Sequence, residues 1–170
     1  MTRWADWIAI SRQEADQFIW AQVQGDEAVY RQLEPHLGQR EENRLHFELD
    51  KTWEPIHRCL TGDRGAAYEF EFDAGEYPLK LCVFGGHQLL YDGHRTATLI
   101  HAKDMAKLAA ALAEISEEWF RGRFFALPDT QMHEIKEPEF RWVWESFADL
   151  RLFFQEVACT DQAVICTISH

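Results

Sequence analysis

The chain has 170 residues, of which 46% are hydrophobic and 14% aromatic, so one buried core can form without disulfides or a structural metal. The formal net charge of −12 would repel polyphosphate, which excludes general nucleic-acid binding, whereas a basic protein would be attracted. No stretch approaches the roughly 18 apolar residues of a membrane helix, and the N-terminal residues lack the apolar run of a secretory signal. We therefore expect a cytoplasmic protein that does not bind membranes.

The first part of the chain predicts a strand followed by two helices. Residues 7–10 form a short apolar run that is typical of a strand. Ser11 and Glu14 have the spacing of a capping box, which predicts a helix from this point to Gly25. A second helix follows directly, and Pro35 inside its pattern indicates that this helix breaks early.

A third helix is predicted over residues 49–61, after a polar loop at residues 39–44. Its apolar stripe consists of Trp53, Ile56, His57 and Leu60. Pro55 constrains where the helix begins. If Thr52 is the N-cap, Pro55 lies in the first turn, where its missing N–H has no consequence. If Asp50 is the N-cap, one backbone hydrogen bond is lost, so we place the N-cap at Thr52.

The middle of the chain predicts a β-hairpin. Residues 68–72 alternate strictly between aromatic and acidic side chains, and residues 79–84 form a second, more apolar segment. The Gly85-Gly86 pair ends that segment. A further turn is expected at Asp92-Gly93, followed by a short strand or bend over residues 96–100.

The C-terminal part predicts three more helices and a final strand. Residues 103–115 show the clearest helical pattern, and residues 116–125 form a second, shorter helix. A loop is expected over residues 127–140, before a long helix that opens at Ser146 or Phe147. Residues 163–168 are apolar and β-branched, which is typical of a strand in the middle of a sheet.

The order of these elements indicates the fold class. Helices and strands are segregated along the chain rather than strictly alternating, which favours an α+β fold over a doubly wound one. The sequence contains no repeat, low-complexity tract or linker. We therefore expect a single α+β domain over residues 1–170, in which a small mixed or antiparallel sheet packs against several helices.

The segment LDKTWEPIHRCLTG at residues 49–62 resembles the LDKxWxxLHxxLTG hallmark of the YfbM-like (DUF1877) family of bacterial proteins, with Ile56 in place of leucine. Residues 84–87, followed by residues 96–112, resemble the Gly-Gly turn of that family and the helix after it. Residues 149–169 fit its closing helix and strand. The resemblance implies an α+β fold of that kind. It implies no activity, because the function of the family is unknown.

One helical face stands out as a candidate binding site. Because Trp53, His57 and Thr61 are spaced four residues apart, they line up on one side of the predicted helix. The candidate binding residues are Asp50, Lys51, Trp53, His57, Thr61, Gly85 and Gly86.

Two interpretations of this face remain open. In the first, Trp53 packs in the core and His57 donates a hydrogen bond to a backbone carbonyl. In the second, Trp53 is the platform of a small cleft and His57 acts as an acid, base or donor. Asp50 and Lys51 then form the rim of that cleft. The Gly85-Gly86 turn would let backbone N–H groups approach a ligand closely.

We expect neither a metal site nor a cofactor. The four cysteines have no CxxC spacing and apolar neighbours, which predicts buried free thiols: Cys59, Cys82, Cys159 and Cys166. Only Cys59, beside Arg58, hints at a reactive thiolate. His87, His94 and His101 recur every seven residues, but no HxH or HxxxH pair is present. The motifs of phosphate-binding loops, serine hydrolases and zinc proteases are also absent.

These observations favour a non-enzymatic protein-binding module. An acidic, aromatic-rich domain suits the sequestration of a basic partner, as in immunity proteins that neutralise toxins, because charge steers association and surface aromatics supply binding energy. The alternative is a small-molecule-binding protein or an enzyme. Its cleft would lie between the Trp53/His57 helix and the Gly85-Gly86 turn.

Overall fold

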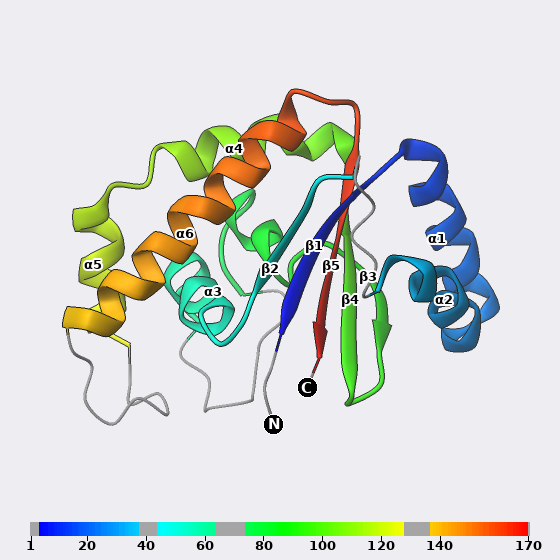
Figure 1. The fold of residues 1–170 in the computed structure, drawn as a ribbon, viewed down its shortest axis with the longest axis horizontal. Helices are drawn as coiled ribbons and strands as arrows, with labels where there is room; N and C mark the ends of the chain where they lie inside the picture. Colours follow the sequence, from blue (N-terminus) through cyan, green and yellow to red (C-terminus); the bar gives the residue numbers. More distant parts are fainter. Residues whose placement is uncertain (1–3, 38–43, 64–73, 128–136, 170) are drawn as a thin grey trace.

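The computed structural model describes residues 4–37, 44–63, 74–127 and 137–169. Within them, five strands form one sheet in the order β2-β1-β5-β4-β3 (Figure 1). All neighbouring strands in this sheet are antiparallel. The strands are β1 (Ala5–Ile10), β2 (His46–Leu49), β3 (His87–Tyr91), β4 (Arg95–Ile100) and β5 (Ala163–Ser169).

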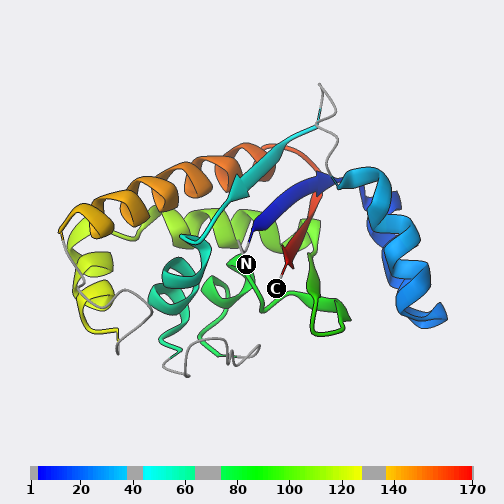
Figure 2. The same ribbon diagram turned by 60° about the horizontal axis from the view of Figure 1, so that its bottom comes forward.

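Helices cover both faces of the sheet. Figures 1 and 2 show α1 and α2 on one side, and α3 to α6 on the other. The helices are α1 (Arg12–Gln24), α2 (Asp26–Leu33), α3 (Trp53–Thr61), α4 (Ala102–Ala113), α5 (Glu117–Phe125) and α6 (Glu137–Ala158). Two short 3-10 helices are η1 (Glu34–His36) and η2 (Leu79–Cys82). The expected α+β class and single domain are therefore confirmed, and the sheet is antiparallel. No helix in the described parts of the chain is both long and apolar enough to cross a bilayer.

The last strand lies at the centre of the sheet, as its sequence predicts. β5 pairs with β1 on one side and with β4 on the other. Its side chains alternate between two buried clusters. Cys166 and Ile168 join the core beneath α3 to α6, whereas Ala163 and Ile165 join the core beneath α1 and α2. A strand covered on both faces needs a continuous apolar run, which explains its composition.

The ends of the first two helices follow the predicted signals. The Ser11 hydroxyl accepts a hydrogen bond from the Glu14 backbone N–H (3.2 Å), and the Glu14 carboxylate accepts one from the Ser11 N–H (2.7 Å). Gly25 separates the two helices and has a φ of 112°, a value that favours glycine. α2 ends at Leu33, so the expected early break before Pro35 is confirmed.

The predicted hairpin was wrong in its second strand. Residues 79–82 form the 3-10 helix η2 rather than a strand. A tertiary contact holds the backbone of this segment, because the Trp7 indole N–H donates to the Cys82 carbonyl over 2.7 Å. Residues 68–72, the predicted first strand, lie outside the described residues.

The observed hairpin joins β3 to β4 through the predicted Asp92-Gly93 turn. The Asp92 carboxylate accepts hydrogen bonds from the N–H groups of His94 (2.8 Å) and Arg95 (2.9 Å), and Gly93 has a φ of 83°. We did not predict β3 because its apolar residues are adjacent rather than alternating. The pairing register shifts between Gln88 and Leu90, which accommodates this pattern.

Two further boundaries differ from the prediction. α6 begins at Glu137 rather than at Ser146, so the last four residues of the expected 127–140 loop are helical. Pro138 lies in the first turn of this helix, where it removes no backbone hydrogen bond. Strand β2 was also missed, because its last residue, Leu49, was assigned to the helix that follows.

Candidate functional site

Helix α3 carries the residues that the sequence singles out, and its N-cap, Thr52, and its last residue, Thr61, are where we expect them. It begins after Thr52, which places Pro55 in the first turn, although the Thr52 side chain makes no capping hydrogen bond. The helix ends at Gly62, whose φ of 75° is left-handed. The Arg58 carbonyl accepts a hydrogen bond from the N–H of this glycine (2.8 Å). Both ends of the helix that carries the candidate binding residues are therefore defined.

The turn after α3 creates a buried pair of titratable groups. Thr61 donates its hydroxyl to the His57 carbonyl (2.8 Å) and accepts a hydrogen bond from the Asp63 N–H (3.2 Å). This arrangement brings Asp63 Oδ2 to 3.7 Å from His57 Nε2, and each of these side chains is only 1% exposed. Burial lowers the pKa of His57 below its ordinary value, and Asp63 opposes that effect. His57 is thus a neutral imidazole at pH 7.

Trp53 and His57 both face the core rather than solvent. Trp53 is 0% exposed, and its ring meets the Phe84 ring edge-on at 5.6 Å between centroids. The His57 ring meets the same phenylalanine edge-on at 4.8 Å. The structure therefore brings α3 beside the segment that leads into the Gly85-Gly86 turn, as the candidate site requires. These contacts support the packing interpretation, and a ligand role for this face stays a prediction.

The two glycines of the turn lie against backbone of the protein itself. A Cβ atom on Gly85 would stand 2.5 Å from the Lys80 carbonyl oxygen, and one on Gly86 would stand 2.7 Å from the Leu99 carbonyl oxygen. Both distances are too short for any side chain. Close packing alone thus explains why both positions are glycine.

The other predicted site residues lie near the ends of α3. Lys51 is exposed and Asp50 is half-buried. The Asp50 backbone carbonyl accepts a hydrogen bond from the Trp53 N–H (3.3 Å). Within the described residues, Oδ1 of Asp50 is buried and makes no hydrogen bond. Thr61 is half-buried at the opposite end. The predicted rim residues and Thr61 thus lie at opposite ends of the helix.

Two arginines in this region were not recognised as structural. Arg58 is 1% exposed, and its Nε donates to the Glu54 carboxylate over 3.3 Å. Arg123 of α5 donates to the Cys59 carbonyl over 3.1 Å. A guanidinium has five N–H donors, so it can satisfy several acceptors at once. The spacing of Glu54 and Arg58, four residues apart on a helix, is the sequence signal for the first contact.

Burial is confirmed for three of the four cysteines, and the prediction was wrong for Cys159, which directly follows the last residue of α6. Cys59, Cys82 and Cys166 are buried free thiols, whereas Cys159 is exposed. Burial raises the pKa of the Cys59 thiol to about 12. The hint of a reactive thiolate at Cys59 was therefore wrong. No group of three His, Cys, Asp or Glu side chains placed to hold a metal ion occurs among the residues that the structure describes.

Acidification is expected to destabilise the protein through His57. Because burial lowers the pKa of His57 in the folded state, the unfolded chain binds a proton there at a pH at which the folded chain does not. The free energy of unfolding should therefore fall as the pH drops below about 6.5, by up to about 1.4 kcal/mol per pH unit from this residue. Urea unfolding of wild type and His57→Gln across this range measures the difference. Equal slopes would contradict a buried, neutral imidazole.

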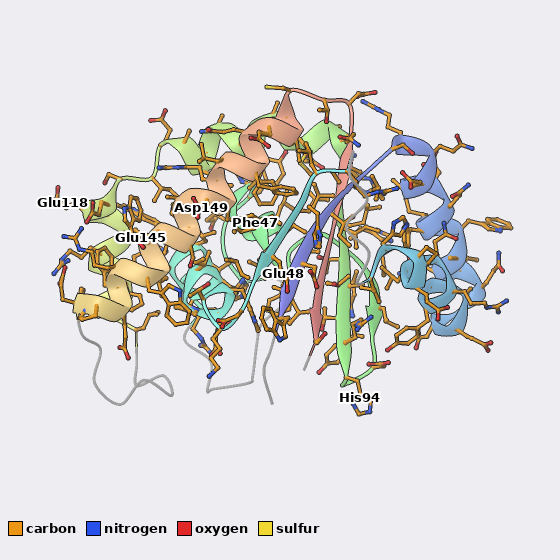
Figure 3. The ribbon with its side chains drawn as sticks, viewed as in Figure 1. Phe47, Glu48, His94, Glu118, Glu145 and Asp149 are labelled. Atoms are coloured by element: carbon orange, nitrogen blue, oxygen red, sulfur yellow. The ribbon has the colours of Figure 1, made fainter. Side chains whose placement is uncertain are left out.

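The outer face of α6 is the feature that sequence reasoning missed. We use this name for the exposed residues Trp142, Glu145, Asp149, Leu152 and Glu156, which recur every three or four positions. Figure 3 shows Glu145 and Asp149 along α6, between Glu118 on α5 and Glu48 on the edge strand β2. The spacing of these residues, three or four positions apart, can be read in the sequence. The predicted helix start at Ser146 or Phe147 leaves Trp142 and Glu145 outside the helix, whereas α6 begins at Glu137.

This architecture, an antiparallel five-stranded sheet with helices on both faces, defines an α+β class of protein. The model of the family described as a domain of unknown function (DUF1877) matches residues 1–167, so the chain belongs to this family. The fold is similar to the crystal structure of YfbM from Escherichia coli, a protein of unknown function. The TM-score is 0.67 at 15% identity, over 97% of this chain and 99% of that one. At this identity the likeness shows the fold alone. None of the curated proteins compared with the chain is a significant match.

Proposed function

We propose that this protein is a non-enzymatic protein-binding module that docks a basic, amphipathic segment of a partner on the outer face of α6. The observation that carries the proposal is the composition of this face. Two large apolar side chains, Trp142 and Leu152, lie in solvent on either side of the carboxylates of Glu145 and Asp149.

The apolar side chains supply the attraction. Trp142 is 44% exposed and Leu152 is 55% exposed. Their positions are about 15 Å apart along the helix, at 1.5 Å per residue. Burying such surface against a partner is favourable, by roughly 25 cal/mol per Å². Tryptophan in particular is enriched among the residues that dominate binding energies. A partner helix of four or five turns would cover both.

The carboxylates of Glu145 and Asp149 make the surface specific for a basic partner. Glu145 and Asp149 stand four residues apart on one helix, where two like charges destabilise the helix by about 0.2–0.5 kcal/mol. Neither makes an ion pair with any other described residue. An arginine or lysine of a partner placed between them would relieve this repulsion. The net charge of −12 would also steer a basic protein toward the surface and raise its association rate.

Binding of a synthetic probe tests this proposal. The probe is a helical peptide of about 15 residues, long enough to span both apolar side chains, with leucine along one face and arginine on both flanks. We expect wild type to bind it, and the Glu145→Lys/Asp149→Lys variant to bind it at least about tenfold more weakly, a loss of about 1.4 kcal/mol. Isothermal titration calorimetry at two salt concentrations measures both constants.

A matched variant separates docking from general attraction by an acidic surface. Glu34→Lys/Glu76→Lys makes the same change of net charge at two exposed positions outside α6. It should bind the peptide within about twofold of wild type, a difference of less than 0.5 kcal/mol. A peptide that fails to bind wild type, or that loses equal affinity for both variants, would contradict the proposal. The alternative function, small-molecule binding at α3, stays a prediction that the Trp53→Ala variant discussed below addresses.

A further inference from the structure

A groove of about 530 Å³ lies between α1 and α2, on the other side of the sheet from α6 (Figure 1). Ala21 of α1 and Ala28 of α2 are part of its lining. These small side chains leave room between two helices that Gly25 joins into a tight hairpin. The groove shares no lining residue with the outer face of α6, so a ligand here would be independent of the docking surface.

Amide side chains dominate the polar lining of this groove. It contains four of the ten glutamines of the chain, Gln13, Gln17, Gln24 and Gln32. The Gln32 amide donates to the Gln17 carbonyl oxygen over 3.2 Å, which links the two helices and orients both groups. A primary amide has a carbonyl acceptor and two N–H donors. The linked pair therefore still offers N–H donors on Gln17 and a carbonyl acceptor on Gln32.

Trp20 adds a flat apolar surface to the same groove. Its side chain is 66% exposed, the highest value among the aromatic residues that the structure describes. An indole ring offers a broad face that binds C–H groups without requiring a hydrogen bond. The groove thus combines one aromatic platform with several neutral donors and acceptors.

The two charged residues that line the groove have opposite signs. Asp16 and Arg31 contribute one charge of each sign. Arg31 lies 3.7 Å from Glu27 in a pair exposed to solvent, and Asp16 makes no ion pair within the described part of the chain. An anionic ligand is disfavoured by the net charge of −12. A wholly apolar ligand would leave the amides without hydrogen-bond partners. The lining instead fits a neutral ligand with many hydroxyl groups and one apolar face.

We propose that the groove between α1 and α2 binds a neutral carbohydrate. A pyranose ring has a face of C–H groups that stacks on Trp20, and a rim of hydroxyls that each donate and accept. Gln17 and Gln32 hydrogen-bond to this rim, and the Asp16 carboxylate accepts from two adjacent hydroxyls. Because the groove is open to solvent, we expect a dissociation constant on the order of millimolar for a single ring of about a dozen heavy atoms.

Nuclear magnetic resonance titration of the labelled protein tests this assignment. The probes are glucose, N-acetylglucosamine, cellobiose and chitobiose. At least one of them should shift the Trp20 indole N–H and the side-chain amides of Gln17 and Gln32 along saturable curves. Trp20→Ala should weaken that binding at least about tenfold and leave the melting temperature unchanged, since the side chain is mostly exposed.

Trp142→Ala serves as the matched control, because it removes an exposed helical tryptophan from the other side of the sheet. Sugar binding to this variant should stay within about twofold of wild type. The proposal is overturned if no sugar gives saturable shifts up to about 50 mM, well above a millimolar constant. It is also overturned if the shifts lie outside the groove, or if both tryptophan variants lose affinity equally. None of these results depends on whether the outer face of α6 binds a partner.

Discussion

Replacing Trp53 with alanine is expected to lower the free energy of unfolding by about 3–5 kcal/mol. Trp53 is wholly buried and meets the Phe84 ring edge-on. It is also the largest apolar side chain of α3, and a helix of nine residues is not stable without docking. Removing the indole would leave a cavity between α3 and the core, which adds to the lost burial.

Chemical denaturation of wild type, Trp53→Ala and Trp20→Ala measures this effect. Trp20 is also a helical tryptophan, but it is mostly exposed, so its replacement should change stability by no more than about 0.5 kcal/mol. His57→Ala should have a smaller effect than Trp53→Ala, because less apolar surface is lost. If Trp53→Ala melts within about 3 °C of wild type, a shift of about 1 kcal/mol at this size, the packing interpretation fails. The face of α3 would then become the first place to look for a ligand.

Adding a single methyl group at Gly86 is expected to destabilise the protein by about 1–3 kcal/mol. The new Cβ would stand 2.7 Å from the Leu99 carbonyl oxygen, and this neighbour belongs to the backbone of β4. Backbone in a sheet cannot move aside as the end of a flexible side chain can. Gly85→Ala should act in the same direction, because its Cβ would meet the Lys80 carbonyl oxygen at 2.5 Å.

Gly122→Ala is the control for this series. Gly122 lies within α5, and no atom beyond its chain neighbours and the backbone of its own helix lies within 4 Å of the position of an added Cβ. Alanine has a higher helix propensity than glycine, so this variant should be more stable by about 0.5–1 kcal/mol. Thermal melts of the three variants beside wild type give the comparison. A Gly86→Ala protein as stable as wild type would show that no backbone packs against this glycine, and would favour the ligand role predicted for the turn.

The elements that could be predicted from the sequence are those that local chemistry defines. The Ser11 capping box, the Gly25 turn and the start of α3 after Thr52 each depend on a few neighbouring residues. The central position of β5 followed from its continuous apolar run. These predictions did not require knowledge of what packs against the element.

The elements that could not be predicted depend on distant contacts. Leu79 to Phe84 is as apolar as a strand, yet the hydrogen bond from Trp7 to Cys82 holds part of it in a short helix against the core. Sequence periodicity contains no information about such a partner. The same holds for His57, whose neighbour Asp63 comes from the turn after the helix. Spacing predicted that Trp53 and His57 share a face, but not that this face is buried.

The outer face of α6 could not be predicted for a related reason. The stripe from Trp142 to Glu156 can be seen only once α6 is known to begin at Glu137. Sequence composition suggested surface aromatics and a basic partner in general terms. Composition gives the number of aromatic residues and does not indicate which of them are exposed.

Capture of the natural partner is the most direct test of the proposal that the outer face of α6 binds a basic protein. Wild type, Glu145→Lys/Asp149→Lys and Glu34→Lys/Glu76→Lys are immobilised and exposed to lysate of the cells that express the protein. Proteins retained by wild type are identified by mass spectrometry, purified and titrated against all three. Our account predicts a partner with a basic isoelectric point that binds the α6 variant at least about tenfold more weakly than wild type and binds the control variant normally. The absence of such a partner, or a partner that binds the α6 variant as tightly as wild type, would contradict it.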